Sequence, residues 1–308
     1  MKMTRYNLIT ILGPTATGKT HLAATLACRI NGEIISADSR QVYRRMDIGS
    51  GKDYSDYIID GNEIPCHLVD IEEPGKHFNV YRFQTGFIQA YKEIIARNRW
   101  PVLCGGSGLY IESVLKNYKL ITVPPNKELR EQLKGKTLDE LTAVLTGLKP
   151  ELHNKTDIET ERRALRAIEI ELYYKNNPMI TTDMPEVKSL NIGLMFDRDT
   201  RRRRIKERLQ QRIEQGMVGE VRQLLDSGLK PQQLIYYGLE YKYITLYLTG
   251  ELTYDEMFTK LEIAIHQFSK RQMTWFRGMM RRGININWID GNISSGDKIE
   301  KILELLNE

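Results

Sequence analysis

The sequence is poor in the residues that bind metals or cross-link a chain. Its 308 residues include three cysteines and five histidines. Cys28, Cys66 and Cys104 stand far apart without Cys-x-x-Cys spacing, and no two histidines form a metal-ligand pair. This scarcity argues against a disulfide framework and a zinc site, and it favours a reducing compartment. We therefore expect the protein in the cytoplasm.

Long apolar runs are also missing. None approaches the roughly 18 residues that a membrane helix requires, so we expect no membrane partner. The first residues, MKMTRYNLITIL, pass directly into a predicted strand, so we expect no cleavable targeting segment. Hydrophobic residues make up 41% of the chain, which is typical of a globular protein of about two domains at this length.

What is present near the N-terminus is the octapeptide GPTATGKT, between a predicted strand and a predicted helix. It matches the phosphate-loop pattern GxxxxGK[ST] in its expected setting. The backbone N–H groups and the helix N-terminus favour an anion there, with Lys19 adding a full charge. The Thr20 hydroxyl is placed to ligate Mg²⁺. The candidate phosphate-binding residues are Gly13, Pro14, Thr15, Ala16, Thr17, Gly18, Lys19 and Thr20.

An acidic pair at the end of an apolar strand, which a nucleoside triphosphatase needs for Mg²⁺ and water, is lacking. The nearest candidate is Asp70 after Leu68-Val69, and it fits a turn residue as well as a metal partner. The loop therefore predicts phosphate binding without predicting hydrolysis of a triphosphate.

The order of predicted elements indicates an α/β fold. Strands alternate with helices, which favours a doubly wound parallel sheet; the predicted strands are Tyr6–Leu12, Glu33–Ala37, Cys66–Asp70, Pro101–Cys104 and Asn191–Phe196. Residues 123–184 show only helical periodicity, so we predict an all-helical insertion domain there. Residues 1–122 and 185–308 would form the catalytic core. Its C-terminal part includes long helices over Thr200–Ser227 and Tyr254–Arg282.

A carboxylate follows the second predicted strand. Asp38 stands at the carboxyl end of that strand, where doubly wound proteins bind their ligands, although an Asp also commonly caps such a turn. Its neighbours Ser39, Arg40 and Gln41 favour a site, since an amide such as that of Gln41 is able to read an adenine edge.

Basic residues gather in three places. On a helix, Arg204, Arg208 and Arg212 form one stripe beside the apolar stripe of Ile205, Leu209 and Ile213, so arginines border the buried face. The other clusters are Arg162, Arg163 and Arg166, and then Lys270, Arg271, Arg277, Arg281 and Arg282 with Trp275 and Phe276 between them. A charge run is usually a solvated face. Three runs on separate elements, one with aromatics, indicate nucleic acid.

In this order the motifs resemble a known family. Seven segments look like motifs of the tRNA dimethylallyltransferases and follow in that family's order. They are GPTATGKT, ISADSRQVYRRMDIGSGK (Ile35–Lys52), HLVDIEEP (His67–Pro74), CGGSGLY (Cys104–Tyr110), ERRALRAIEI (Glu161–Ile170), RIKERLQQRIEQGMVGEV (Arg204–Val221) and KRQMTWFR (Lys270–Arg277). The resemblance covers nearly the whole chain.

The resemblance implies an activity and site residues. The family transfers a dimethylallyl group from its diphosphate to the exocyclic amine of the adenosine 3′ of a tRNA anticodon, with Mg²⁺ assisting. Its phosphate loop holds the donor diphosphate. By similarity, Asp38 is the general base, Arg208 a diphosphate and catalytic contact, and Ser107 a site residue where the family usually has Thr. We expect a monomer that binds the anticodon stem-loop through Asp38, Ser39, Arg40, Gln41, Arg162, Arg163, Ala164, Leu165, Arg166, Arg204, Lys270 and Arg271.

Three departures from the family pattern affect the expected tRNA contacts. Where the family has GYKE, this chain has Gly238-Leu239-Glu240-Tyr241. Where the family has an acidic residue before proline, it has Lys149-Pro150, and after MDIG it has SGKDY where the family tends toward TAKP. Three alternatives remain open: a prenyltransferase acting on free adenine nucleotides, a phosphate-loop kinase of a small molecule, and an RNA-binding protein with a vestigial loop.

Overall fold

The computed structural model describes residues 5–149, 155–177 and 183–307, so the first four residues and Pro150 lie outside it. The chain divides into two compact units. One, the core unit, spans Met1–Tyr118 and Met184–Glu308, and the other, the insertion unit, spans Lys119–Asp183. In the part of the chain that the structure describes, no helix has both the length and the apolar character needed to cross a membrane.

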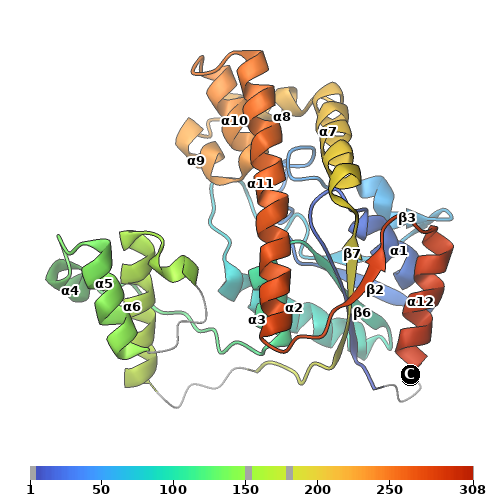
Figure 1. Cartoon of the computed structure of the whole chain (residues 1–308), viewed down its shortest axis with the longest axis horizontal. Helices are drawn as coiled ribbons and strands as arrows, with labels where there is room; N and C mark the ends of the chain where they lie inside the picture. Colours follow the sequence, from blue (N-terminus) through green and yellow to red (C-terminus); the bar gives the residue numbers. More distant parts are fainter. Residues whose placement is uncertain (1–4, 150–154, 178–182, 308) are drawn as a thin grey trace. The chain divides into compact units, whose positions relative to one another are not determined.

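The core unit is built on a parallel sheet of six strands in the order β5-β2-β6-β1-β7-β8 (Figure 1). They are β1 (Leu8–Leu12), β2 (Gly32–Ser36), β5 (Cys66–His67), β6 (Trp100–Gly105), β7 (Ser189–Met195) and β8 (Asn287–Asp290). The predicted α/β fold with a parallel sheet is confirmed. The run Cys66–Asp70 forms only a two-residue strand, and β8 was not predicted. A separate hairpin pairs β3 (Ile58–Ile59) with β4 (Asn62–Glu63).

Alternating apolar side chains of β1 bury both faces of the sheet. Leu8 and Leu12 join one hydrophobic cluster, whereas Ile9 and Ile11 join the other. The first cluster receives α2 (Val80–Ala96), α3 (Gly108–Leu115) and α11 (Tyr254–Arg281). The second receives α1 (Lys19–Ile30) and α12 (Ser295–Asn307). Helices on both faces leave the ends of the strands as the place for a site.

The basic run after β7 folds as two helices instead of the single predicted one. Helix α7 covers Arg198–Glu214 and α8 covers Met217–Asp226. Gly216 separates them with φ 100°, a left-handed conformation that a helix interior does not contain. The core unit continues through α9 (Pro231–Tyr236) and α10 (Leu239–Leu248) to α11.

The insertion unit contains helices as its only regular structure among the described residues. These are α4 (Lys127–Gln132), α5 (Leu138–Leu148), the 3₁₀ turn η2 (Lys155–Ile158) and α6 (Glu161–Asn176). Leu141, Leu145, Ala164 and Ile168 form its own small core. Thr137 and Glu140 close a capping box at the start of α5.

A buried carboxylate organises the polar side of this unit. Glu169 accepts hydrogen bonds from Arg130 Nε (2.6 Å) and Arg166 Nη1 (2.8 Å), as well as from the backbone of Asn126. Burial alone would raise the pKa of Glu169, but the arginine hydrogen bonds bring it down to about 2. Arg166 also donates to the Val123 carbonyl, so this arginine contributes to the fold of the unit.

Candidate active site at the carboxyl ends of β1, β2 and β6

Three loops meet at the carboxyl ends of β1, β2 and β6, because these strands are parallel neighbours in the sheet. The phosphate loop follows β1, the Asp38 segment follows β2, and Gly105–Ser107 follows β6. A first cavity of about 210 Å³ is lined by Lys19, Asp38, Arg40, Ser107, Phe268 and Gln272, among others. A second cavity of about 860 Å³ is lined by Thr17, Lys19, Asp53, Asp56, Arg204 and Arg208, among others. Lys19, Thr20, Arg208 and Arg212 line both.

The phosphate loop has the backbone geometry that an anion cradle requires. Ala16 and Gly18 have positive φ of 62° and 76°, which turns the chain around the start of α1. Lys19 Nζ lies 2.7 Å from the Pro14 carbonyl oxygen. Burial, with a smaller contribution from the positive charge of Arg208, lowers the pKa of Lys19 to about 8. The negative charge of a bound anion would raise this pKa again, so the environment of the Lys19 ammonium suits an anion.

Gln272 of α11 ties the phosphate loop to the loop after β6. Its Oε1 accepts from the Thr15 backbone N–H (2.9 Å), and its Nε2 donates to the Gly106 carbonyl (3.0 Å). The sequence analysis did not single out Gln272, although it lies within the quoted KRQMTWFR motif. Its helix positions do identify it: a polar residue stands on the buried side of α11 next to Met273 and Phe276.

Asp38 lies in the wall of the first cavity beside Ser107. Asp38 Oδ1 accepts from the Arg40 backbone N–H at 2.8 Å, and Ser107 Oγ accepts from the Ser39 N–H at 3.3 Å. The position of Asp38 is therefore compatible both with a residue that stabilises the turn and with a residue of the functional site. One oxygen holds the turn while the carboxylate lines the cavity. The Arg40 guanidinium lies 5.2 Å from the ring centre of Tyr236, which is 46% exposed.

Gln41 uses both ends of its amide inside the protein. Its Oε1 accepts from Ser36 Oγ (3.0 Å), and its Nε2 donates to the Gly51 carbonyl (3.0 Å). The side chain is buried. In this structure Gln41 therefore links the end of β2 to the 49–51 segment, and a base-reading role would require it to release one of these bonds.

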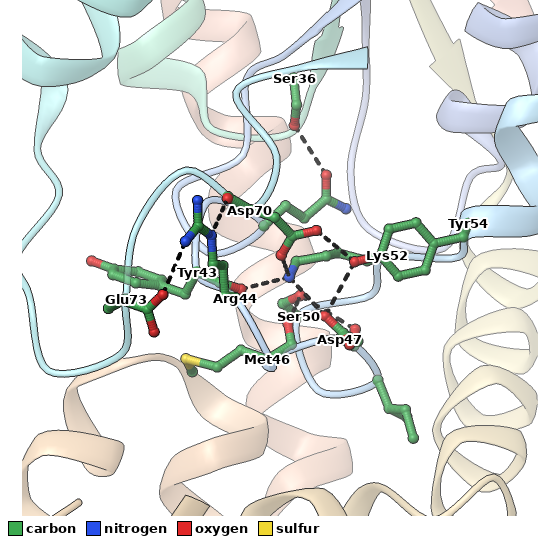
Figure 2. Close-up of polar contacts among 12 residues, drawn as sticks. Ser36, Tyr43, Arg44, Met46, Asp47, Ser50, Lys52, Tyr54, Asp70 and Glu73 are labelled. Atoms are coloured by element: carbon green, nitrogen blue, oxygen red, sulfur yellow. Dashed lines mark hydrogen bonds and ion pairs between the residues drawn. The ribbon is translucent and has the colours of Figure 1, made fainter. Parts of the chain in front are cut away.

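A buried lysine anchors the same segment. Lys52 Nζ donates to the Tyr43 carbonyl (2.5 Å), to Asp47 Oδ1 (2.8 Å) and to Asp70 (Figure 2). Tyr54 OH donates to Asp70 Oδ2 at 2.6 Å. Asp70, the residue considered for a metal, is thus the counter-ion of Lys52. The pair fixes the backbone just before Asp53, which lines the second cavity.

The arginines of α7 face the phosphate loop, as their predicted stripe indicates. Arg204 Nε donates to the Ala16 carbonyl at 2.9 Å, and its guanidinium lies 4.7 Å from the Phe196 ring centre. Arg208 Nη2 lies 2.7 Å from Asp53 Oδ2. Arg212 is nearly buried. The acidic partner of this run, Asp53, comes from a segment 155 residues away in the sequence.

The third basic cluster separates into buried and exposed residues. Trp275 Nε1 and Arg282 both bind the buried Glu112, and Phe276 is fully buried in the core. Phe276 is therefore used in packing and is unable to stack on a base, whereas Trp275 is half-buried. Lys270 and Arg271 are exposed on α11, and Arg271 lies 5.9 Å from the ring centre of Phe268. In the insertion unit, Arg162 and Arg163 are exposed and Leu165 is half-buried.

The described residues contain no group of three or more His, Cys, Asp or Glu side chains arranged to hold a metal ion. Mg²⁺ in phosphate sites keeps several waters and depends largely on substrate oxygens. Thr20, at the start of α1 and in the wall of both cavities, fits such an ion. The residues present therefore suit a metal that binds together with a phosphorylated substrate.

Comparison with known proteins shows the family of this chain. The family model for IPP transferase matches residues 41–279, and that for isopentenyl transferase matches residues 6–63. The chain belongs to the IPP transferase family. It is 57% identical to tRNA dimethylallyltransferase 2 of Bacteroides fragilis over 308 residues, covering both chains fully. It is 58% identical to tRNA dimethylallyltransferase 2 of Porphyromonas gingivalis over 97% of this chain and 98% of that one.

A solved structure gives the same picture of this IPP transferase. The full-length tRNA isopentenylpyrophosphate transferase from Bacillus halodurans superposes with a TM-score of 0.71 at 33% identity. The match covers 97% of this chain and 95% of that one. The parallel sheet and its helices are therefore shared over nearly the whole chain, and this transferase is a prenyl-transferring enzyme of that family.

The Gly238–Tyr241 segment lies against the loop of residues 47–49 in this transferase. Tyr241, from the altered GLEY segment, donates to Glu220 at 2.8 Å. Glu220 also accepts from the backbone N–H groups of Asp47, Ile48 and Gly49, at 2.8, 2.7 and 3.0 Å. A Cβ on Gly49 would lie 2.7 Å from the Tyr241 ring. The altered segment therefore supports the loop that precedes the altered SGKDY stretch.

Proposed function

We propose that this chain transfers a dimethylallyl group from dimethylallyl diphosphate to the exocyclic amine of the adenosine 3′ of a tRNA anticodon, releasing diphosphate. One observation carries the proposal: Asp38 lines the same cavity as Lys19 and Arg208, so a base and an anion site face one space. The names of the relatives, tRNA dimethylallyltransferases at 57 and 58% identity, support it.

The donor half of the site stabilises the leaving group. As the allylic C–O bond breaks, the electron pair leaves with the diphosphate, and its negative charge grows. The phosphate-loop N–H groups, Lys19 and Arg208 are positioned to oppose that charge, and such preorganised groups commonly give the largest single contribution to catalysis. Mg²⁺ held by Thr20 and the diphosphate would neutralise part of it when bound.

The acceptor half of the site serves the adenine amine, a weak nucleophile because its lone pair is delocalised into the ring. Its nitrogen forms a bond to the allylic carbon and loses one proton. Asp38 accepts that proton, which typically contributes about 10²–10⁴-fold to the rate. Ser107 Oγ accepts a hydrogen bond from the N–H of Ser39, the residue after Asp38, and helps to orient the acceptor. No water needs activation, so the missing acidic pair of a triphosphatase is consistent with this reaction.

Access to this site requires the adenosine to leave its stack, at a cost of about a few kcal/mol. Phosphate contacts offset that cost. The exposed cations assigned to these contacts are Arg162, Arg163, Lys270 and Arg271, joined by the half-buried Arg40 and by Arg204 at the phosphate loop. We assign the insertion unit to binding of the anticodon stem-loop, with Ser39 near the acceptor in the core unit.

The chain is proposed to act as a monomer. All three cysteines are free, which supports the cytoplasm as its location.

The test is transfer of label from radioactive dimethylallyl diphosphate with Mg²⁺ to unmodified tRNA, with AMP and ATP as parallel acceptors. Label in tRNA alone is the expected result. Label in AMP or ATP would instead assign the chain to the free-nucleotide prenyltransferases. Consumption of ATP without label transfer would contradict the proposal and indicate a phosphate-loop kinase.

A further inference from the structure

Arg212 is a buried cation whose hydrogen-bonding groups are not satisfied. Its side chain is 10% exposed, and among the described residues neither Nε nor Nη2 has a hydrogen-bond partner. The nearest carboxylate oxygen in an ion pair, Asp53 Oδ2, lies 3.9 Å from Nη2, too far for a hydrogen bond. A buried guanidinium without partners is unfavourable unless something else pairs with it.

The position of Arg212 points to an anion as that missing partner. It follows Arg208 by one helical turn on α7 and lies in the wall shared by both cavities, with Lys19 and Thr20. Gly51 faces both guanidiniums, and a Cβ there would collide with Arg212 Nη2 and reach 3.1 Å from Arg208 Nη2. The loop therefore leaves room for two arginines side by side at the mouth of the phosphate loop.

A single carboxylate faces this pair from the loop. Asp53 Oδ2 lies 2.7 Å from Arg208 Nη2 and 3.9 Å from Arg212 Nη2. The carboxylate of Asp53 is thus shared by two guanidiniums, and Arg212 gains no hydrogen bond from it. A diphosphate carries more charge and more acceptor oxygens than this carboxylate, and it suits the fork geometry of arginine.

We infer that Arg212 is a second arginine that binds the donor diphosphate, and that Asp53 is the counter-ion that the diphosphate replaces. The inference rests on the proposed function, since it assigns a further binding residue to that donor site. Burial, with the positive charge of Arg208, lowers the pKa of Arg212 to about 10 although Glu240 and Asp53 act against it. Glu240 lines the first cavity together with Arg212 and adds negative charge there, but Nε and Nη2 of Arg212 gain no hydrogen bond from it.

This role makes a prediction opposite to that of a structural arginine. Replacing a buried, unsatisfied charge by an apolar side chain of similar length is commonly neutral or stabilising. Arg212→Met should therefore keep or raise the Tm of the ligand-free protein while weakening diphosphate binding. A structural arginine would lose Tm in the same variant.

The experiment measures binding of inorganic diphosphate with Mg²⁺ by calorimetry, together with the Tm with and without it. We expect Arg212→Met to raise the Kd at least tenfold, and Arg212→Lys to raise it less because it keeps the charge but not the fork. Asp53→Asn should lower the Kd severalfold. Arg203→Met, an exposed position on the same helix, is the matched control and should change nothing.

Two results overturn the inference. One is a Kd within twofold of wild type in Arg212→Met, and the other is absence of diphosphate binding by the wild-type protein. Should Arg212→Met fail to fold, the Kd of Arg212→Lys for diphosphate takes its place, and an unchanged Kd in that variant would also overturn the inference. The proposed function is tested separately. Prenyl transfer to tRNA with an unchanged donor KM in Arg212→Met contradicts the inference alone, whereas diphosphate binding that depends on Arg212 without any prenyl transfer contradicts the proposed function alone.

Discussion

At the scale of single residues, Asp38 combines a turn contact with the proposed proton transfer, and one substitution separates the two. Asn at this position keeps an oxygen that accepts from the Arg40 N–H, so the turn should persist. It removes the basic carboxylate, so we expect Asp38→Asn to lower kcat by about 10²–10⁴-fold. The measurement is single-turnover prenyl transfer, with tRNA affinity determined in parallel.

The control for Asp38→Asn is Asp60→Asn, at an exposed acidic residue that lines neither cavity. This control should retain wild-type turnover. Unchanged turnover in Asp38→Asn itself would show that Asp38 is a turn residue only. A loss of tRNA affinity equal to the loss of rate would place Asp38 in binding instead of proton transfer.

Lys52 tests whether the anchor beneath the site matters for stability. Its ammonium is fully buried and bonded to Asp47, Asp70 and the Tyr43 carbonyl. Lys52→Met leaves the Tyr43 carbonyl and two partly exposed carboxylates without their donor, so it should lower the free energy of unfolding by about 1–3 kcal/mol. Urea unfolding measures this, with the exposed Lys76→Met as the control. A loss below about 0.5 kcal/mol, the usual range of surface substitutions, would contradict the role.

At the scale of elements, two glycines near the break between α7 and α8 should respond in opposite directions. Gly216 has φ 100°, and a Cβ there meets nothing within 4 Å, so Gly216→Ala costs only backbone strain, about 1 kcal/mol. Gly219 lies inside α8, also with open space around it, so Gly219→Ala should stabilise the fold by about 0.5–1 kcal/mol. Thermal unfolding of both variants checks the signs. Equal effects would contradict the assigned break.

The same break shows what periodicity is able to predict. The apolar spacing of 200–227 is helical throughout, so sequence alone predicts one helix, and only the left-handed φ of Gly216 divides it. Strand β8 was not predicted because its four residues, Asn287–Asp290, are too few for a period-two signal and gain their stability from pairing with β7. The phosphate loop was predictable because its function depends on local backbone geometry.

The site was only partly predictable for a related reason. Asp38 and the arginine stripe were found because strand ends and helix periods are local signals. Asp53 and Gln272 were not, since Asp53 meets Arg208 across 155 residues and Gln272 meets Thr15 across 257. Such contacts exist only once the sheet has brought the loops together. The sequence predicted that the Gln41 amide binds an adenine base, but in the structure this amide is hydrogen-bonded to Ser36 and Gly51.

At the scale of the whole molecule, Glu169 makes the stability of the insertion unit depend on pH. Its folded pKa is about 2 and its ordinary value 4.5. Its stabilising contribution is therefore fully present above about pH 4.5 and is lost as the pH falls toward 2. Glu169→Gln should be less stable than wild type at pH 6, and this difference should shrink between pH 4.5 and 2. Urea unfolding followed by circular dichroism measures both. A difference that stays constant with pH would contradict the depressed pKa.

The charge of the whole chain is only +5, so tRNA binding depends on where the cations lie. Binding through phosphates releases counterions, and we expect the tRNA affinity to fall steeply between low and physiological salt. Arg162→Ala, Lys270→Ala and Arg271→Ala should each reduce the logarithmic salt slope by about one. Arg166→Ala is the matched control. Its guanidinium already binds Glu169 and the Val123 carbonyl, so it should lower the stability of the insertion unit and leave the slope unchanged.

These four variants distinguish a tRNA surface from a solvated one. Filter binding or fluorescence anisotropy at five salt concentrations gives each slope, and urea unfolding gives each stability. A flat salt dependence in the wild-type protein would contradict phosphate binding altogether. A reduced slope in Arg166→Ala with unchanged stability would show that this arginine leaves Glu169 to reach the tRNA. The ion pairs of the insertion unit would then be part of the recognition surface, because tRNA phosphates would compete with Glu169 for the same guanidinium.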